Sequence, residues 1–347
     1  MSTGQVEQLL RGGVATAVGS WPGTDSREAA ATIVGELGDL AHLVELPGRG
    51  TGSDMIGRAS ALLVDLPFDA TTRGYRLTAR PGAVSRRARD LLRTDLDALE
   101  EAWEGTGSVG AGRTVKLQAA GPLTLAAQLE LGNGHRVLTD SGAVRDLSES
   151  LAEGLTRHAA EVAARLGAKV VVQLDEPSST AVLEGWLPGT SALDSVRAVP
   201  APEALSVLDS VITAVPAPVL VHTCADRPAL EFLRGSAAAA IGFDLATIGT
   251  RDLDDIGELL ETGKQLALGL IPVQSPTTPI TWRELAEPAV RLVDRLGVGR
   301  RTLADRVLIS PACGLANTPL AWARRVLSLA TEIARAFAED PESLTFD

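Results

Sequence analysis

The chain has 347 residues, of which 45% are hydrophobic and 22% are charged, so it can bury a sizeable core and is not globally disordered. Its net charge of −12, with no basic stripe, argues against nucleic acid and anionic membrane surfaces as partners. The first thirteen residues lack the pattern of a secretory signal and no apolar run is long enough to span a bilayer, so we expect a cytoplasmic protein.

Short apolar runs alternate with helical patterns along the chain. Most runs are apolar on both faces and end at glycine, proline or polar residues, which is typical of parallel strands covered on both sides. In chain order the sequence predicts a strand at 14–21, a helix at 26–40, strands at 41–47 and 114–122, a helix at 141–167, a strand at 168–177, a helix at 201–215, strands at 217–224, 238–246, 265–273 and 305–314, and a helix at 319–340. This alternation predicts an α/β fold, the (β/α)8 TIM barrel.

The stretch between the second and third predicted strands, about 48–113, is too long for one crossover. We expect this insertion to hold extra helices and a small hairpin near 73–84. No internal repeat or linker divides the sequence, so we expect residues 1–347 to form a single domain.

Side chains that can bind a metal stand at the predicted carboxyl ends of the strands, where barrels of this kind have their active sites. His222 and Cys224 are separated by one residue at the end of the fifth strand, so alternation turns both to the same side. Cys313 takes the corresponding place on the eighth strand, and Asp244 ends the sixth. One imidazole nitrogen, two thiolate sulfurs and one carboxylate oxygen form a donor set that suits Zn²⁺.

Other interpretations apply to each of these residues taken singly. A buried cysteine often packs as a small hydrophobic residue, and a lone histidine at a strand end is usually structural. Asp244 fits a helix cap or an ion-pair partner as well as a ligand. The joint placement of His222, Cys224 and Cys313 favours the metal, because the chain has only two cysteines and four histidines.

Five segments resemble the catalytic half of the cobalamin-independent methionine synthases, in the same order along the chain. They are "AVGSWPGTDSREA", "VKLQAAGPLTL", "VVQLDEP", "VHTC" and "PACGL", and together they extend over about 14–330. The most specific pieces are the His-x-Cys pair, the distant Cys-Gly and the Asp-Glu-Pro. The resemblance implies a (β/α)8 barrel, in agreement with the strand pattern, and a free-standing catalytic core.

The resemblance also implies a chemistry. In that family zinc is held by one histidine, two cysteines and a carboxylate, which places the ligands here at His222, Cys224, Cys313 and, by alignment of the sixth strand, Asp244 in place of the usual glutamate. The substrate of the family is homocysteine, whose thiol binds the zinc, loses its proton and attacks a methyl group. Asp175 would pair with the ammonium group of the substrate, and the backbone near Ser20 would hold its amino-acid part.

The chain departs from the family pattern at three places. The second ammonium-binding carboxylate falls on Arg49, which could instead grip a carboxylate or phosphate. The general-acid histidine aligns with Gln274, which can donate a hydrogen bond but not a proton. The folate-binding tryptophan is missing, and Ala181 stands in place of the folate-binding glutamate.

These departures leave the methyl donor open between a methylfolate and a more reactive donor such as a methylcorrinoid or a sulfonium, which needs no acid. The leading hypothesis is a zinc-dependent methyltransferase that acts on a homocysteine-like thiol. One alternative is the related barrel of the uroporphyrinogen decarboxylases and corrinoid methyltransferases. The other is a degenerate barrel that binds a ligand without turnover.

Overall fold

A computed structural model describes residues 10–107, 112–190 and 195–345. It contains an eight-stranded sheet in the order β1-β11-β10-β9-β8-β7-β5-β2, in which all neighbouring strands are parallel. The strands are β1 (Val14–Ala15), β2 (Leu40–His42), β5 (Thr114–Ala120), β7 (Lys169–Asp175), β8 (Val219–Thr223), β9 (Ala240–Asp244), β10 (Gln265–Ile271) and β11 (Val307–Pro311). The predicted TIM-barrel fold is confirmed, with each predicted strand present at or inside its predicted range, apart from the first residue of β2.

The two edges of this sheet meet just beyond β1 and β2. Ser20 and Glu45 form a parallel β-bridge. The backbone N–H of Trp21 donates to Glu45 O (2.8 Å), and the N–H of Glu45 donates to Gly19 O (3.1 Å). The first predicted strand, 14–21, is therefore interrupted after two residues of ladder and resumes at Ser20, where it closes the barrel.

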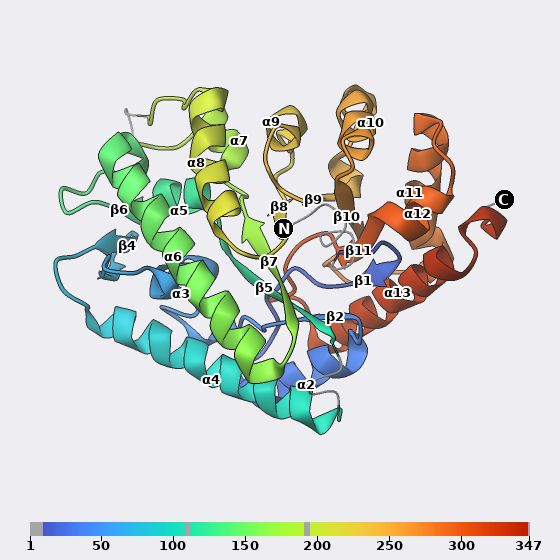
Figure 1. Cartoon of the computed structure of the whole chain (residues 1–347), viewed down its shortest axis with the longest axis horizontal. Helices are drawn as coiled ribbons and strands as arrows, with labels where there is room; N and C mark the ends of the chain where they lie inside the picture. The colour runs from blue at the N-terminus through green and yellow to red at the C-terminus, as the bar shows by residue number, and fades with distance from the viewer. Residues whose placement is uncertain (1–9, 108–111, 191–194, 346–347) are drawn as a thin grey trace.

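Helices surround the strands (Figure 1). Four of them match the predicted ranges closely, although the helix predicted at 26–40 already ends at Glu36 because β2 begins at Leu40. The helices outside the insertion are α2 (Ser26–Glu36), α5 (Pro122–Gln128), α6 (Ser141–Leu166), α7 (Ser179–Glu184), α8 (Ala201–Ala214), α9 (Leu230–Arg234), α10 (Leu253–Glu261), α11 (Trp282–Leu296), α12 (Arg301–Arg306) and α13 (Leu320–Glu339). Short 3₁₀ helices are η1 (Pro47–Arg49), η2 (Val137–Thr139), η3 (Leu245–Thr247), η4 (Thr250–Asp252) and η5 (Pro341–Ser343). None of the helices in the described ranges is both long and apolar enough to cross a lipid bilayer.

The insertion after β2 holds two helices and a hairpin, as expected, but the hairpin lies earlier than predicted. It consists of β3 (Phe68–Thr71) and β4 (Gly74–Leu77), and β6 (Leu129–Glu130) adds a third strand parallel to β4. The helices are α3 (Met55–Leu62) and α4 (Ala83–Gly105). Only the second strand of the hairpin falls inside the predicted range 73–84. The turn is the two-residue link before Gly74, whose φ of 144° favours glycine, and the chain is already helical from Ala83.

The interior of the barrel has an apolar floor and a polar upper part. The floor is a separate cluster of inward-facing residues, closed from below by the fully buried Leu10: Leu40, Val171, Leu220, Ala240, Ala267 and Leu308. Two residues further along the strands the same inner face carries polar side chains, among them Gln173 on β7 and His222 on β8. The polar groups therefore lie toward the carboxyl ends of the strands.

Candidate active site

The imidazole of His222 is held by the carboxylate of Asp175. The two residues are register partners on β8 and β7, and His222 Nδ1 lies 2.9 Å from Asp175 Oδ1. The other ring nitrogen, Nε2, is buried and has no hydrogen-bond partner among the described residues. On the next strand, β9, the register partner of His222 is Gly242. A Cβ atom at this position would lie only 3.3 Å from Cδ2 of the imidazole, so the glycine leaves room beside the ring. The site thus presents one buried nitrogen that lacks a partner, which is the usual arrangement of a metal-binding histidine with its supporting carboxylate.

The two cysteines lie side by side. Cys224 follows β8 and Cys313 follows β11, and their Sγ atoms are 2.9 Å apart. The hydrogen bond between them lowers the pKa of Cys313 below its ordinary value. The same hydrogen bond and burial raise the pKa of Cys224. The arrangement therefore favours one thiolate within the pair.

Asp244 ends β9, the strand between β8 and β10, but its carboxylate is engaged locally. Its Oδ1 accepts from the backbone N–H of Ala246 (2.9 Å) and caps η3. Across residues 10–107, 112–190 and 195–345, no three or more His, Cys, Asp and Glu side chains converge closely enough to hold a metal ion. The structure pairs the cysteines and pairs His222 with Asp175, while the ligand role of Asp244 stays a prediction.

Three of the predicted substrate-binding residues, Ser20, Gln274 and Arg49, have different surroundings in the structure. Ser20 lies against the loop that carries Cys313, since a Cβ atom on Gly314 would come within 2.2 Å of Ser20 Oγ. Gln274 is exposed beyond the end of β10. The guanidinium of Arg49 is almost buried and its Nη2 donates to Asp95 Oδ2 (2.7 Å), so this charge is already paired within the protein.

Two buried charged residues belong to this region although the sequence analysis did not single them out. Glu45 forms the β-bridge with Ser20. Burial raises the pKa of its carboxyl group to about 7, although the positive charge of Arg58 acts to lower this pKa. The nearby charge of Asp175 also raises this pKa, and Glu45 Oε1 has no hydrogen-bond partner among the described residues.

The second is Lys116, which is fully buried on β5, and burial lowers its pKa to about 8. A charged residue inside an otherwise apolar strand was the signal that could have found it.

Glu176, the remaining acidic residue of the Asp-Glu-Pro motif, has a structural role. Oε1 of Glu176 accepts from the backbone N–H of Leu123 (2.9 Å). Oε2 accepts from the N–H (2.8 Å) and the hydroxyl (2.6 Å) of Thr124. The carboxylate therefore caps the start of α5 and ties this helix to the end of β7.

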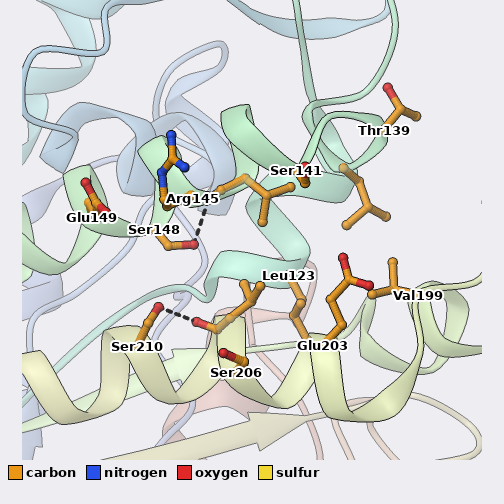
Figure 2. A pocket seen from close by; sticks show the side chains of 13 residues that line it. Leu123, Thr139, Ser141, Arg145, Ser148, Glu149, Val199, Glu203, Ser206 and Ser210 are labelled. Atoms are coloured by element: carbon orange, nitrogen blue, oxygen red, sulfur yellow. Dashed lines mark hydrogen bonds between the residues drawn. The ribbon is translucent and has the colours of Figure 1, made fainter.

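A cavity lies elsewhere, among the helices outside the barrel. It has a volume of about 510 Å³ and is lined mainly by α6 and α8, with Arg145 and Ser148 on one side and Glu203 and Ser206 on the other (Figure 2). None of the predicted site residues lines it. This cavity is therefore separate from the candidate active site.

The fold and these side chains define a (β/α)8-barrel protein whose thiols, imidazole and carboxylates gather at the carboxyl ends of the strands. The chain belongs to the family of cobalamin-independent synthase catalytic domains, whose model matches residues 14–336. No protein with a curated description matches the sequence significantly.

Solved structures that share the fold have low sequence identity to this chain. One is a B12-independent methionine synthase from Shewanella sp. W3-18-1 in complex with selenomethionine, with 15% identity, a TM-score of 0.60 and coverage of 93% of this chain and 98% of that one. Another is a methyltransferase from Methanosarcina mazei, with 16% identity, a TM-score of 0.57 and coverage of 94% and 93%. The family match favours the synthase barrel over the decarboxylase barrel that the sequence left open.

Proposed function

We propose that this protein is a zinc-dependent methyltransferase that transfers a methyl group to a thiol of the homocysteine type. The observation that carries the proposal is the pair of thiols 2.9 Å apart, together with a buried histidine nitrogen that has no hydrogen-bond partner in the described part of the chain. Membership of the synthase family supports it, and so does the likeness of the fold to a methionine synthase that holds selenomethionine.

The donor types fit zinc, which binds thiolate sulfur and neutral imidazole nitrogen. Cys224, Cys313 and Nε2 of His222 would be three ligands, and Asp244 would be the fourth if its carboxylate leaves the cap of η3. When bound, the metal would keep a substrate thiol, whose ordinary pKa is about 8.5, in its thiolate form at neutral pH.

The protein's own residues would bind and orient the amino-acid part of the substrate. Oδ1 of Asp175 is occupied by His222 and Gln173, whereas Oδ2 makes no hydrogen bond to any described residue. This oxygen would accept from the substrate ammonium group, and so would Glu45 Oε1, which makes no hydrogen bond to a described residue and lies 3.8 Å from Arg58 Nε. Glu45 then supplies the second carboxylate that the family pattern lacks at Arg49, whose guanidinium serves Asp95 instead.

The methyl donor is inferred from the residue that aligns with the general acid of the family. Gln274 cannot deliver a proton to a leaving group, so we propose a donor that needs none, a methylated corrinoid or a sulfonium, rather than a methylfolate. Turnover with methyltetrahydrofolate equal to that with methylcobalamin would contradict this choice of donor and leave the zinc site intact.

Metal analysis of the purified protein tests the proposal. We expect one zinc per chain, and zinc loss in the variants His222→Asn, Cys224→Ser and Cys313→Ser. The matched control is His135→Asn, which changes an exposed histidine and should keep its zinc. Homocysteine titration followed at the zinc absorption edge should add one sulfur ligand. Zinc retained by both cysteine variants, or an edge that homocysteine does not change, would overturn the proposal.

A further inference from the structure

A buried lysine lies inside the barrel below the site, and the proposed function does not use it. Lys116 is one of only three lysines in the chain and is 0% exposed. Its Nζ donates to the backbone oxygens of Ala17 (2.6 Å) and Val18 (3.0 Å), and to Oε1 of Gln173. An ammonium group has three hydrogens to donate and accepts none, so these three acceptors satisfy it completely.

The lysine fixes which way the Gln173 amide points. Because Nζ can only donate, the atom of Gln173 that faces it must be the carbonyl oxygen. The amide nitrogen Nε2 then faces the other way and donates to Val18 O (2.8 Å) and to Asp175 Oδ1 (2.8 Å). Both of these oxygens are acceptors, so this is the one orientation in which every contact of the amide is a hydrogen bond.

The same reasoning extends one step further, to the histidine. Asp175 Oδ1 accepts from Gln173 and lies 2.9 Å from His222 Nδ1. A carboxylate oxygen can pair with this nitrogen only if Nδ1 carries a hydrogen. In the neutral ring the lone pair is then on Nε2, the buried nitrogen that lacks a partner.

We propose that Lys116 is a positioning residue which, through Gln173 and Asp175, selects the tautomer of His222 that leaves the Nε2 lone pair free. Without the ammonium group, the carbonyl oxygen of Gln173 is a buried acceptor that lacks its donor, so the amide is no longer held in place and its hydrogen bond to Asp175 Oδ1 is weakened. The carboxylate of Asp175 would then be free to turn, and His222 Nδ1 would lose its fixed acceptor. The consequence for zinc rests on the proposed function, whereas the choice of tautomer does not.

Nitrogen NMR of the metal-free protein, labelled with ¹⁵N-histidine and held at a pH where the rings are neutral, tests this directly. The chain has only four histidines, and loss of one set of ring signals in His222→Gln assigns the residue. We expect a single tautomer with unprotonated Nε2 in the wild type, and a mixture of tautomers in Lys116→Met. Gln173→Met, which removes the connecting amide and keeps the lysine, should give the same mixture and decides the question if the lysine variant does not fold.

Lys264 offers a matched control. It is a partly buried lysine that donates to the backbone oxygens of Ser236 (2.6 Å) and Ala238 (2.7 Å), just before β10 and at the opposite end of the barrel. Lys264→Met removes a similar set of hydrogen bonds and should leave the His222 tautomer unchanged.

Zinc affinity, measured by competition with a chromophoric chelator, gives a second readout. We expect Lys116→Met and Gln173→Met to bind zinc about 10- to 100-fold more weakly, the usual cost of losing a residue that supports a ligand. A wild-type tautomer in both variants would overturn the proposal. A shifted tautomer in a protein that never binds zinc would uphold it and reject the proposed function instead.

Discussion

The Sγ atoms of Cys224 and Cys313 lie 2.9 Å apart, although 89 positions separate the residues in the sequence. Their strands, β8 and β11, are not neighbours, because β9 and β10 lie between them in the sheet. Contact between the thiols is therefore a product of barrel closure, which brings the ends of distant strands around one opening.

This proximity makes the metal-free protein sensitive to oxidants. A disulfide has an S–S distance of about 2.05 Å, so the sulfurs need to approach by only about 1 Å. We expect a mild oxidant such as diamide to reduce the titratable thiols from two per chain to none, without forming dimers, and we expect bound zinc to prevent this. Thiol titration and non-reducing electrophoresis measure the result. Cys224→Ser is the control, since its single thiol can form only intermolecular bonds, and survival of both thiols in the oxidised wild type would contradict the prediction.

The buried carboxyl group of Glu45 should make stability depend on pH. Burial raises its pKa from 4.5 to about 7. Between pH 4.5 and pH 7 the carboxyl group is therefore protonated in the folded state and ionised in the unfolded state. This contribution is complete below pH 4.5 and is lost as the pH rises through 7. Glu45→Gln removes it, so the variant should gain about 3 kcal/mol of unfolding free energy relative to wild type between pH 4.5 and pH 8, by the usual 1.36 kcal/mol per pKa unit.

Chemical denaturation at several pH values provides the measurement. The control is Glu36→Gln, which changes an exposed carboxylate at the end of α2 and should run parallel to the wild type. A constant difference between Glu45→Gln and wild type over this pH range would show that Glu45 titrates normally in the fold.

The strand pattern predicted the barrel because the strands of the barrel are buried on both faces, so each one appears in the sequence as a mostly apolar run. The same property hid Lys116, since a single lysine in "TVKLQAA" looked like a minor interruption of a strand. Its three acceptors come from β7 and from the segment after β1, and their convergence depends on closure of the barrel.

Local sequence was also a poor guide to pairing. Arg49 was predicted to bind a substrate anion, and this role stays a prediction. Its partner in the structure, Asp95, lies 46 positions away on α4, inside the insertion, and no sequence periodicity indicated this pairing. For Asp244, in contrast, the sequence left two roles open, a helix cap and a metal ligand. In the structure its side chain caps η3, the short helix that directly follows it.

The contact between Ser20 and Gly314 predicts a specific rescue. Gly314 does not have a positive φ, so an alanine there is acceptable to the backbone, but its Cβ atom would lie 2.2 Å from Ser20 Oγ and 3.4 Å from Ser20 Cβ. Gly314→Ala should therefore cost about 1 kcal/mol of stability and disturb the adjacent Cys313, with weaker zinc binding. Adding Ser20→Ala removes the clashing oxygen and should restore both properties.

A double-mutant cycle measures the coupling between these two sites by denaturation and by zinc competition. Ser20→Ala alone serves as the control and should differ little from wild type. Equal losses in Gly314→Ala and in the double variant would show that the hydroxyl is not the obstacle.

The last prediction concerns Glu176, whose two oxygens accept from three donors on Leu123 and Thr124. In Glu176→Gln one oxygen becomes an NH₂ group that faces a backbone N–H, so a buried donor loses its acceptor at a cost of about 1–3 kcal/mol. Denaturation should show this loss, and hydrogen exchange should show faster exchange at the amides of Leu123 and Thr124. Glu184→Gln, an exposed change on α7, should alter neither. If the variant is fully stable and both amides still exchange slowly, the prediction is wrong. In that case apolar contacts, and not this carboxylate, hold α5 against the end of β7, where Glu176 directly follows Asp175.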